Sequence, residues 1–463
     1  MDPKRSEKII LISPPSSWIY GDIPYPPLGI ATLSAMTKQA VGTYPTIIDG
    51  QLSDYKDRLK KTLTDTTPLV VGISSTLLQL PKALKVAKQF KSKNKNTMVI
   101  IGGAAPSCMS PANFFKYSED VVDAIVFGEG DYTWQEITQK ILGDRTLKTN
   151  KLLKNIQGTA FKVGSDIVVN TPRPRITQLD KLPMPDFDGI RAQEYINLWK
   201  KNGGFGSISI FPSRGCPFLC TFCDKSVFGN RFVHQSPKRI ADEMHRITKK
   251  FYNLDEIFLF DDNLSTNEQV MINLCEQIEK RCLNVRWSVQ ARVDTVNEKM
   301  LKKMYHAGCR DIYFGIETAS KKLLEFIKKG FSVEQAKETV RLCHKVGINP
   351  GAFFIVGIPG ETKQDIETIA KFIKEVKPKH IGFSVLTPFP GTQLYKNTQQ
   401  LIRPELLNKY EAWDDTRRSV YKKGTFEVDP KMSIQYLDAI FHQTLKENKM
   451  SVDQSQFVIK RYD

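Results

Sequence analysis

The 463-residue sequence contains no apolar run long enough to cross a membrane, and Met1–Lys8 lacks the apolar stretch of a secretory signal. Its 8 cysteines are too few to staple a chain of this length with disulfides. Histidine is also scarce, and all 6 residues lie at or beyond His234. These absences argue against a membrane-spanning or disulfide-rich secreted protein. We therefore expect a soluble protein of the reducing cytoplasm.

Positive charge is in excess, with 67 lysine and arginine residues against 50 acidic residues and a net charge of +17. A basic chain can bind nucleic acid. Here the basic residues are spread along the sequence and interleaved with acids, as at Pro237–Lys250 and Lys321–Lys345. This pattern favours lysine-rich, solvated helix faces. A nucleic-acid partner is kept as the alternative.

The densest cysteine pattern is C-x3-C-x2-C, formed by Cys216, Cys220 and Cys223. Three thiolates on one short loop can bind three irons of a [4Fe–4S] cluster and leave the fourth iron open. Structural zinc is the alternative, but it usually requires a second cysteine pair or histidines. The remaining cysteines are scattered and form no second pair, which favours the cluster: Cys108, Cys275, Cys282, Cys309 and Cys343.

Strands and helices alternate over the first part of the chain. The expected strands are Lys8–Ser13, Pro45–Ile48, Leu69–Ser74, Met98–Ile101 and Ala124–Phe127. The expected helices are Ala31–Gln39, Tyr55–Leu63, Ala83–Lys91 and Tyr132–Leu142. This alternation predicts an α/β fold with a doubly wound, Rossmann-like parallel sheet that binds its ligand at the carboxyl ends of the strands. No G-x-G-x-x-G follows the first strand, so a dinucleotide is not supported.

A second alternation begins at Ser207, after a connector over Leu152–Asp188 that contains an expected hairpin and a proline-rich end. It predicts a partial (βα)6 barrel of the TIM type, in which function resides at the carboxyl ends of the strands. The expected strands are Ser207–Phe211, Glu256–Phe260, Arg286–Gln290, Asp311–Gly315, Ala352–Val356 and His380–Leu386.

Charged residues follow the strands of this expected barrel. Asp262 follows the second strand, where a helix cap is the alternative role. Arg292 follows the third and can hold a carboxylate bidentately, with a surface salt bridge as the alternative. Glu317 follows the fourth and can bind an ammonium group. After the fifth strand, an adenine can lie against the backbone of Gly357, Ile358 and Pro359.

The cysteine motif, with Phe222 just before its last cysteine, resembles that of the radical S-adenosylmethionine (SAM) superfamily. In that family the open iron binds the amino and carboxylate groups of SAM, and one electron from the cluster yields a 5′-deoxyadenosyl radical. Phe222 resembles the aromatic residue that packs near the adenine, and a core phenylalanine is the alternative. The expected SAM contacts are Phe222, Asp262, Gln290, Arg292, Glu317, Gly357, Ile358 and Pro359.

The segment Lys8–Leu142 resembles the cobalamin-binding domain of the cobalamin-dependent radical SAM family, through PYPPLGI, VGIS, a GG pair and FGEGD. It has no Asp-x-His-x-x-Gly motif, so the resemblance implies cobalamin without a histidine ligand from this domain. The sequence does not identify a group that approaches the lower face of cobalt, and Leu77, Leu78 and Gln79 after the third strand are candidates. The expected cobalamin contacts are Pro26, Leu28, Ser74, Ser75, Thr76, Gly102, Gly103, Gly128, Glu129 and Gly130.

The resemblance implies an enzyme that methylates an unactivated carbon of a small-molecule or peptide substrate, with an external electron donor of the flavodoxin or ferredoxin type. Cyclisation or rearrangement, modification of tRNA and a non-enzymatic scaffold remain alternatives. The expected domains are residues 1–150 for cobalamin, a linker over 151–204, the barrel over 205–395, and a mainly helical C-terminal extension over 396–463. The sequence identifies neither the substrate nor a residue that takes a proton or quenches a radical.

Overall fold

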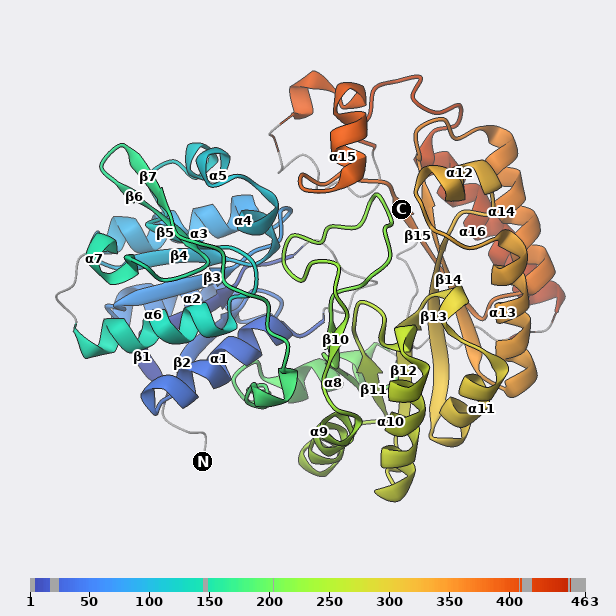
Figure 1. Ribbon diagram of the computed structural model, residues 1–463, viewed down its shortest axis with the longest axis horizontal. Helices are drawn as coiled ribbons and strands as arrows, with labels where there is room; N and C mark the ends of the chain where they lie inside the picture. Colours follow the sequence, from blue (N-terminus) through green and yellow to red (C-terminus); the bar gives the residue numbers. More distant parts are fainter. Residues whose placement is uncertain are drawn as a thin grey trace.

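The protein folds around two large sheets, one mainly and one entirely parallel, that lie side by side in the computed structural model (Figure 1). The structure describes residues 5–16, 25–144, 149–202, 204–407, 409, 419–448 and 450. The N-terminal sheet and its helices are drawn in blue to teal, and the second sheet runs from green to orange. The loops between the two sheets therefore come from both halves of the chain.

Seven strands form the N-terminal sheet in the order β2-β1-β3-β4-β5-β6-β7. The first five strands are parallel, and β6 and β7 join them as an antiparallel hairpin. The doubly wound prediction is confirmed, and the hairpin expected in the connector is instead the edge of this sheet. The strands are β1 (Ser6–Ser13), β2 (Pro45–Asp49), β3 (Val70–Ser74), β4 (Met98–Gly102), β5 (Ala124–Val126), β6 (Thr159–Val163) and β7 (Asp166–Val169).

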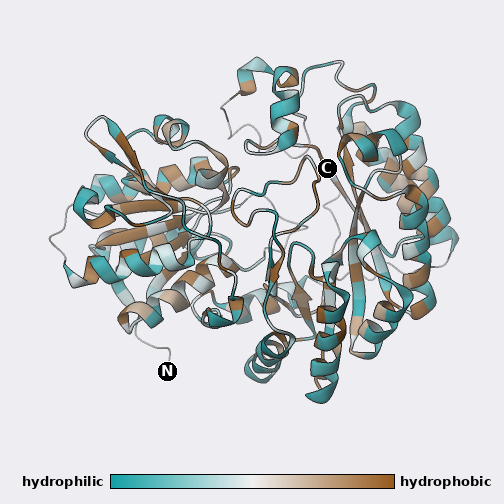
Figure 2. Cartoon of the chain, in the orientation of Figure 1, coloured by the Kyte–Doolittle hydropathy of each residue, from teal (hydrophilic) through white to brown (hydrophobic). Residues whose placement is uncertain are grey.

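Helices cover both faces of the N-terminal sheet, which explains the continuous apolar run of β1. Successive side chains of a strand point to opposite faces. Ile9 and Leu11 accordingly belong to one buried cluster, and Ile10 and Ile12 belong to another. Figure 2 shows brown, apolar strands between helices whose outer sides are teal. The helices are α1 (Leu28–Val41), α2 (Tyr55–Asp65), α3 (Leu80–Lys93), α4 (Ala104–Cys108), α5 (Pro111–Tyr117), α6 (Asp131–Gly143) and α7 (Thr149–Leu153).

The second sheet contains six parallel strands in the order β15-β14-β13-β12-β11-β8, which confirms the partial barrel. Its strands are β8 (Ser207–Ile210), β11 (Glu256–Leu259), β12 (Arg286–Ala291), β13 (Cys309–Glu317), β14 (Asn349–Val356) and β15 (His380–Val385). Helices lie on its outer side in Figure 1. They are α9 (Pro237–Lys250), α10 (Glu268–Lys280), α11 (Glu298–His306), α12 (Lys321–Phe326), α13 (Val333–Val346) and α14 (Lys363–Val376).

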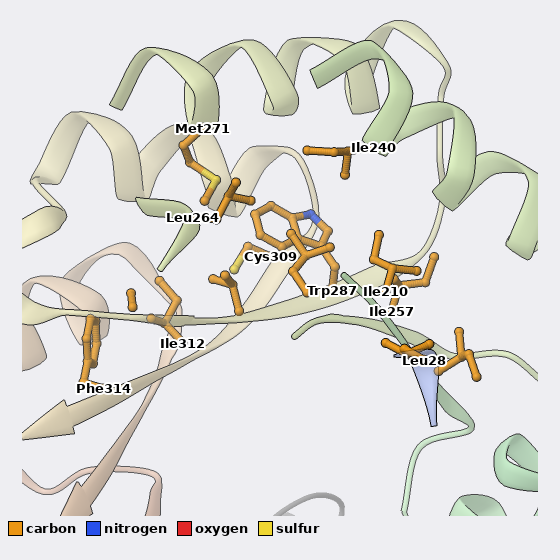
Figure 3. Close-up of a cluster of buried hydrophobic side chains, with 14 of the residues drawn as sticks. Leu28, Ile210, Ile240, Ile257, Leu264, Met271, Trp287, Cys309, Ile312 and Phe314 are labelled. Carbon is orange, nitrogen blue, oxygen red and sulfur yellow. The ribbon is translucent and has the colours of Figure 1, made fainter. Parts of the chain in front are cut away.

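Trp287 on β12 fills the space between the barrel strands and their outer helices (Figure 3). The side chain is fully buried, and its indole Nε1 donates a hydrogen bond to the carbonyl oxygen of Ala307 at 2.8 Å. A buried indole is favourable when its N–H finds such an acceptor. Met271 from α10 and Ile240 from α9 lie around it, so the outer helices are fixed against the strands that carry the loops.

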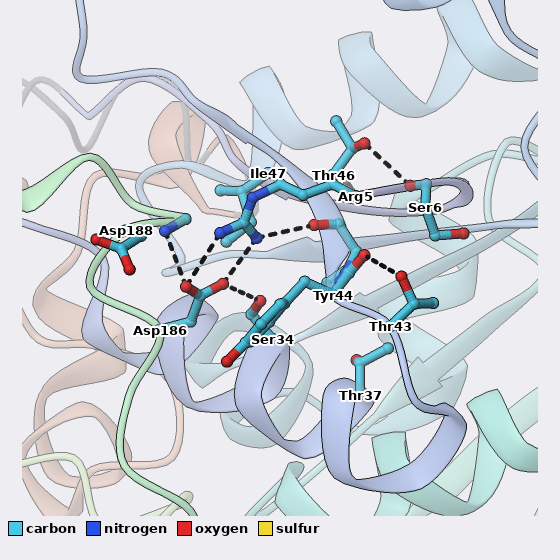
Figure 4. A network of polar contacts seen from close by, with 12 residues as sticks. Arg5, Ser6, Ser34, Thr37, Thr43, Tyr44, Thr46, Ile47, Asp186 and Asp188 are labelled. Atoms are coloured by element: carbon cyan, nitrogen blue, oxygen red, sulfur yellow. Dashed lines mark hydrogen bonds and ion pairs between the residues drawn. The ribbon is translucent and has the colours of Figure 1, made fainter. Parts of the chain in front are cut away.

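Asp186 ties the connector to the N-terminal domain (Figure 4). Its carboxylate accepts hydrogen bonds from Arg5 Nη1 at 2.7 Å and Nη2 at 3.0 Å, and from Ser34 Oγ at 2.5 Å. The expected linker over residues 151–204 also contains η1 (Leu179–Lys181) and helix α8 (Ala192–Lys201), which the sequence did not reveal. It is therefore an ordered segment bound to the first sheet.

The described part of the C-terminal extension is mainly helical, although residues 419–429 are not helical and Tyr421 among them forms a bridge with Ile402. It contains α15 (Gln393–Thr398), η4 (Gln399–Leu401), η5 (Pro404–Leu406) and α16 (Pro430–Glu447). The helix expected at Ser433–Lys446 is α16, which packs on α14. Residues 410–418 and 451–463 of the expected extension lie outside the described part of the chain. Among the described helices, none is both long and apolar enough to cross a membrane.

Candidate active site

A closed loop carries the three cysteines beyond the carboxyl end of β8. Strand β9 (Ser213–Arg214) pairs antiparallel with β10 (Val233–His234), so the two ends of the loop are held together. Gly215 opens the loop with φ of +79°, and a Cβ there would stand 2.3 Å from the carbonyl oxygen of Arg231. Only glycine fits so close an approach. The close approach of the two chains at the base of the loop therefore requires glycine immediately before Cys216.

The loop is suited to bind a metal cluster through its free thiols. Cys216, Cys220 and Cys223 form no disulfide. Cys223 is exposed, whereas Cys216 and Cys220 are half-buried. A cysteine binds metal as its thiolate, so cluster binding must displace the proton of each thiol.

Each cysteine of a cluster binds its own iron, so the thiolates need not converge on one point. No group of three or more His, Cys, Asp or Glu side chains in the described ranges is arranged to hold a single metal ion. The loop itself is folded back by Lys225, whose Nζ donates to the carbonyl oxygens of Cys216, at 3.0 Å, and Phe218.

Arg292 lies against the cysteine loop. Its Nη1 is 3.4 Å from Cys220 Sγ, and its guanidinium carbon is 3.7 Å from the ring centroid of Phe218. Asp294 accepts from its Nε at 2.9 Å and from Nη2 at 2.8 Å. The side chain is buried, so its ion pair with Asp294 is not the surface salt bridge considered from the sequence. Asp294 holds Nε and Nη2, and Nη1 is the nitrogen that faces the cysteine loop.

Glu317 ends β13 in a left-handed conformation, with φ of +69°. Its carboxylate forms a buried ion pair with Lys329 Nζ at 2.7 Å. Lys329 also lies over the ring of Phe222, with Nζ 5.7 Å from the ring centroid. Lys329 was not predicted from the sequence, because it follows a short helix, whereas the charged residues that were predicted follow strands. A ligand ammonium that reaches Glu317 must share this carboxylate with Lys329.

Asp262 positions the cysteine loop: its Oδ2 accepts a hydrogen bond from the backbone N–H of Gly215 at 2.6 Å. The alternative of a helix cap is wrong, because Asn267 caps α10 by accepting from the N–H of Val270. Gln290 is half-buried on β12. Gly357 has φ of +78° and donates its N–H to Glu361 Oε2 at 2.7 Å, with Ile358 buried and Pro359 half-buried beside it.

The expected cobalamin residues lie at the carboxyl ends of β3, β4 and β5. A Cβ on Gly103, which has φ of +96°, would stand 2.8 Å from the carbonyl oxygen of Ser75, so these two loops touch. Gly128 has φ of +74°, and its N–H donates to Ser107 Oγ at 3.0 Å. The remaining members lie in these loops or at the start of α1: Pro26, Leu28, Ser74, Thr76, Gly102, Glu129 and Gly130.

The candidates for the lower face of cobalt are three buried residues after β3, namely Leu77, Leu78 and Gln79. Gln79 donates from Nε2 to the carbonyl oxygen of Pro14 at 2.8 Å. Its Oε1 accepts from the N–H and the hydroxyl of Thr76 at 3.1 and 3.0 Å. The amide of Gln79 therefore joins the loop after β3 to the segment that follows β1.

Glu129 contacts the other domain. Its Oε1 accepts from Arg214 Nη1 at 2.9 Å, and its Oε2 accepts from the backbone N–H of Ile176 at 2.8 Å. Both carboxylate oxygens are occupied by protein donors, and the expected contact of Glu129 with cobalamin stays a prediction. Arg214 directly precedes Gly215 and Cys216, and the ion pair therefore joins the loop after β5 to the cysteine loop.

Comparison with known proteins identifies both halves of the chain. Residues 210–373 match the model of the Radical SAM superfamily, and residues 22–138 match the B12 binding domain. An uncharacterized methyltransferase of Pyrococcus horikoshii is 33% identical over 84% of this chain and 82% of its own length. An anaerobic magnesium-protoporphyrin IX monomethyl ester cyclase of Rubrivivax gelatinosus is 27% identical over 84% of this chain and 68% of its own.

Solved structures agree on the fold. The radical SAM methyltransferase TsrM of Kitasatospora setae, with tryptophan and a SAM analogue bound, superposes with a TM-score of 0.68, 18% identity and coverage of 85% of this chain and 76% of its own. The cobalamin-dependent SAM radical enzyme OxsB gives a TM-score of 0.67, 19% identity, and coverage of 97% and 64%. The chain belongs to the cobalamin-dependent radical SAM enzymes, whose cofactors are a [4Fe–4S] cluster, SAM and cobalamin.

Proposed function

We propose that this enzyme transfers a methyl group to an unactivated carbon of a small-molecule or peptide substrate. The observation that carries the proposal is the 33% identity to a methyltransferase over most of both chains. When bound, SAM and the cluster supply a 5′-deoxyadenosyl radical that removes a hydrogen atom, and methylcobalamin supplies the methyl group. The protein's part is to bind these groups, orient them and exclude water.

The contact between the two domains supports a shared active site. The loop of Gly128–Gly130 follows β5, and the cysteine loop follows β8, so both lie at carboxyl ends of parallel strands. Ligands of both fold types bind at such ends. Arg214 links the two loops through Glu129 at 2.9 Å. This link favours a substrate held between cobalamin on one loop and SAM on the other.

The residues near the cysteine loop take the following proposed roles. Arg292 binds the carboxylate of SAM, and Glu317 binds its amino group, with Lys329 alternating between Glu317 and the ligand carboxylate. The backbone at Gly357–Pro359 accommodates the adenine, because Gly357 presents no side chain and φ of +78° turns the chain there. Cobalamin lies on the backbone of the β3, β4 and β5 loops.

Cyclisation without methyl transfer is the second candidate. It is favoured by the 27% identity to a magnesium-protoporphyrin ester cyclase over 84% of this chain. Both reactions begin with removal of a hydrogen atom from carbon, so the residues around SAM serve either one. The two proposals differ only in whether a methyl group reaches the product.

An isotope experiment separates the two reactions. The anaerobically reconstituted enzyme is incubated with a chemical reductant, SAM bearing a deuterated methyl group, and a small-molecule and peptide extract of the source cells. Methyl transfer predicts a product heavier than its precursor by one labelled methyl group. A product formed together with 5′-deoxyadenosine but without the label supports cyclisation and contradicts methyl transfer.

A further inference from the structure

A groove of about 890 Å³ lies on the outer side of the barrel between α12, α13 and α14. Its floor is apolar, with Leu324, Phe331 and Phe372. The rim carries four lysines against two glutamates: Lys321, Lys328, Lys337, Lys371, Glu325 and Glu334. An apolar centre inside a charged rim is the usual composition of a protein interface.

Most lysine side chains at the rim of this groove have no acidic partner among the described residues. Lys321, Lys328 and Lys371 are exposed and form no ion pair with any described residue, whereas Lys337 pairs with Glu375 at 2.6 Å. Free lysines around an apolar floor favour an acidic partner that also buries apolar surface.

One side chain separates the groove from a cluster cysteine. Phe331 lines the groove, and its ring centroid is 5.4 Å from the guanidinium carbon of Arg292. Arg292 Nη1 in turn lies 3.4 Å from Cys220 Sγ. The backbone makes a second link, since the N–H of Thr221 donates to the carbonyl oxygen of Ile327 at 3.0 Å, at the end of α12. A partner seated in the groove therefore lies next to the cysteine loop.

We propose that this groove is the docking site of an acidic one-electron carrier protein with a flavin centre. The proposal rests on the proposed function, since radical generation from SAM consumes one electron per cleavage. In the docked complex the reduced carrier is oxidised by one electron and the enzyme is reduced by one, with no bond formed between the two proteins. Positive charge at the rim steers the carrier, and the apolar floor receives its exposed side chains.

Binding is tested with purified oxidised flavodoxin and the reconstituted enzyme. Calorimetric titration compares the wild type with the double charge reversal Lys321→Glu/Lys371→Glu at low and at raised salt. We expect binding that weakens with salt and a Kd that rises roughly tenfold or more in the variant. The matched control is Lys85→Glu/Lys88→Glu, two exposed lysines on α3 of the other domain, which is expected to keep the wild-type Kd.

A Kd that is unchanged in Lys321→Glu/Lys371→Glu, or that rises equally in the control, overturns the docking site. SAM cleavage driven by dithionite is measured in parallel and is expected to be equal in all three proteins, because this reductant needs no docking surface. If the wild type does not cleave SAM with dithionite, the result contradicts the proposed function and not the docking site. The two failures are thus distinguished.

Discussion

Arg214, at the end of β9 just before the cysteine loop, forms a bidentate ion pair with Asp131 at the start of α6, with distances of 2.7 and 3.1 Å. Both side chains are buried. Glu129, two residues before Asp131, also forms an ion pair with Arg214. The partners are 83 positions apart in the sequence. This pair holds the two cofactor-binding halves of the enzyme in one arrangement.

Replacing Asp131 with asparagine is expected to lower the free energy of unfolding by about 3 kcal/mol, because it leaves part of a buried guanidinium charge uncompensated. Urea denaturation measures this change. The matched control is Asp120→Asn, which removes an ion pair with Lys162 in which the aspartate side chain is 93% exposed. An exposed pair of this kind contributes about 1 kcal/mol or less. Equal losses in the two variants would show that the Arg214 pair is not an important link.

Alanine at Cys216, Cys220 or Cys223 is expected to abolish the iron–sulfur absorption and most of the bound iron, because each thiolate binds a separate iron. Iron analysis and the visible spectrum of anaerobic protein provide the measurement. Cys282→Ala is the control, since Cys282 is exposed and follows α10, away from the cysteine loop. A variant of the three that keeps the wild-type iron content contradicts the assignment.

Arg292→Lys is expected to weaken SAM binding about 10- to 100-fold, because it removes both Nη1, which faces Cys220, and the double hydrogen bond to Asp294 that orients it. Glu317→Gln is expected to have a loss of similar size, since the amide carries no charge for the ligand ammonium. Equilibrium dialysis with the reconstituted protein measures both affinities. Glu325→Gln, at an exposed site on α12, serves as the control. Wild-type affinity in both test variants would place SAM elsewhere.

Glu256 makes stability depend on pH. It is fully buried at the start of β11, and burial, followed by the nearby Asp311 carboxylate, raises its pKa from 4.5 to about 8. Between these two values the unfolded chain releases a proton that the folded protein keeps, so this group's contribution is present at low pH and is lost as pH rises towards 8.

Glu256→Gln removes this titration. The variant is expected to gain stability relative to the wild type, on the order of 2–4 kcal/mol, between about pH 5 and about pH 8. Urea denaturation across this range measures the difference. Glu276→Gln on the exposed side of α10 should show no such trend. A difference between Glu256→Gln and wild type that is constant with pH contradicts the raised pKa.

The sequence predicted those parts of the fold that depend on local pattern. Buried parallel strands such as β1 are short apolar runs, and Gly215 and Gly357 mark turns that only glycine enters easily. Helix α8 was not predicted, because its residues follow a proline-rich stretch and the whole region was interpreted as a linker. The roles of Glu129 and Lys329 were also missed, since their partners Arg214 and Glu317 lie 85 and 12 positions away and only the folded chain brings them together.

The most direct test of the account is to load the wild-type protein with iron, sulfide and cobalamin without oxygen, and to supply SAM and a chemical reductant. We predict that one polypeptide holds both the iron–sulfur cluster and the corrinoid after gel filtration, and that it cleaves SAM to 5′-deoxyadenosine. Protein that emerges colourless, with neither iron nor corrinoid, and that leaves SAM intact would contradict the account.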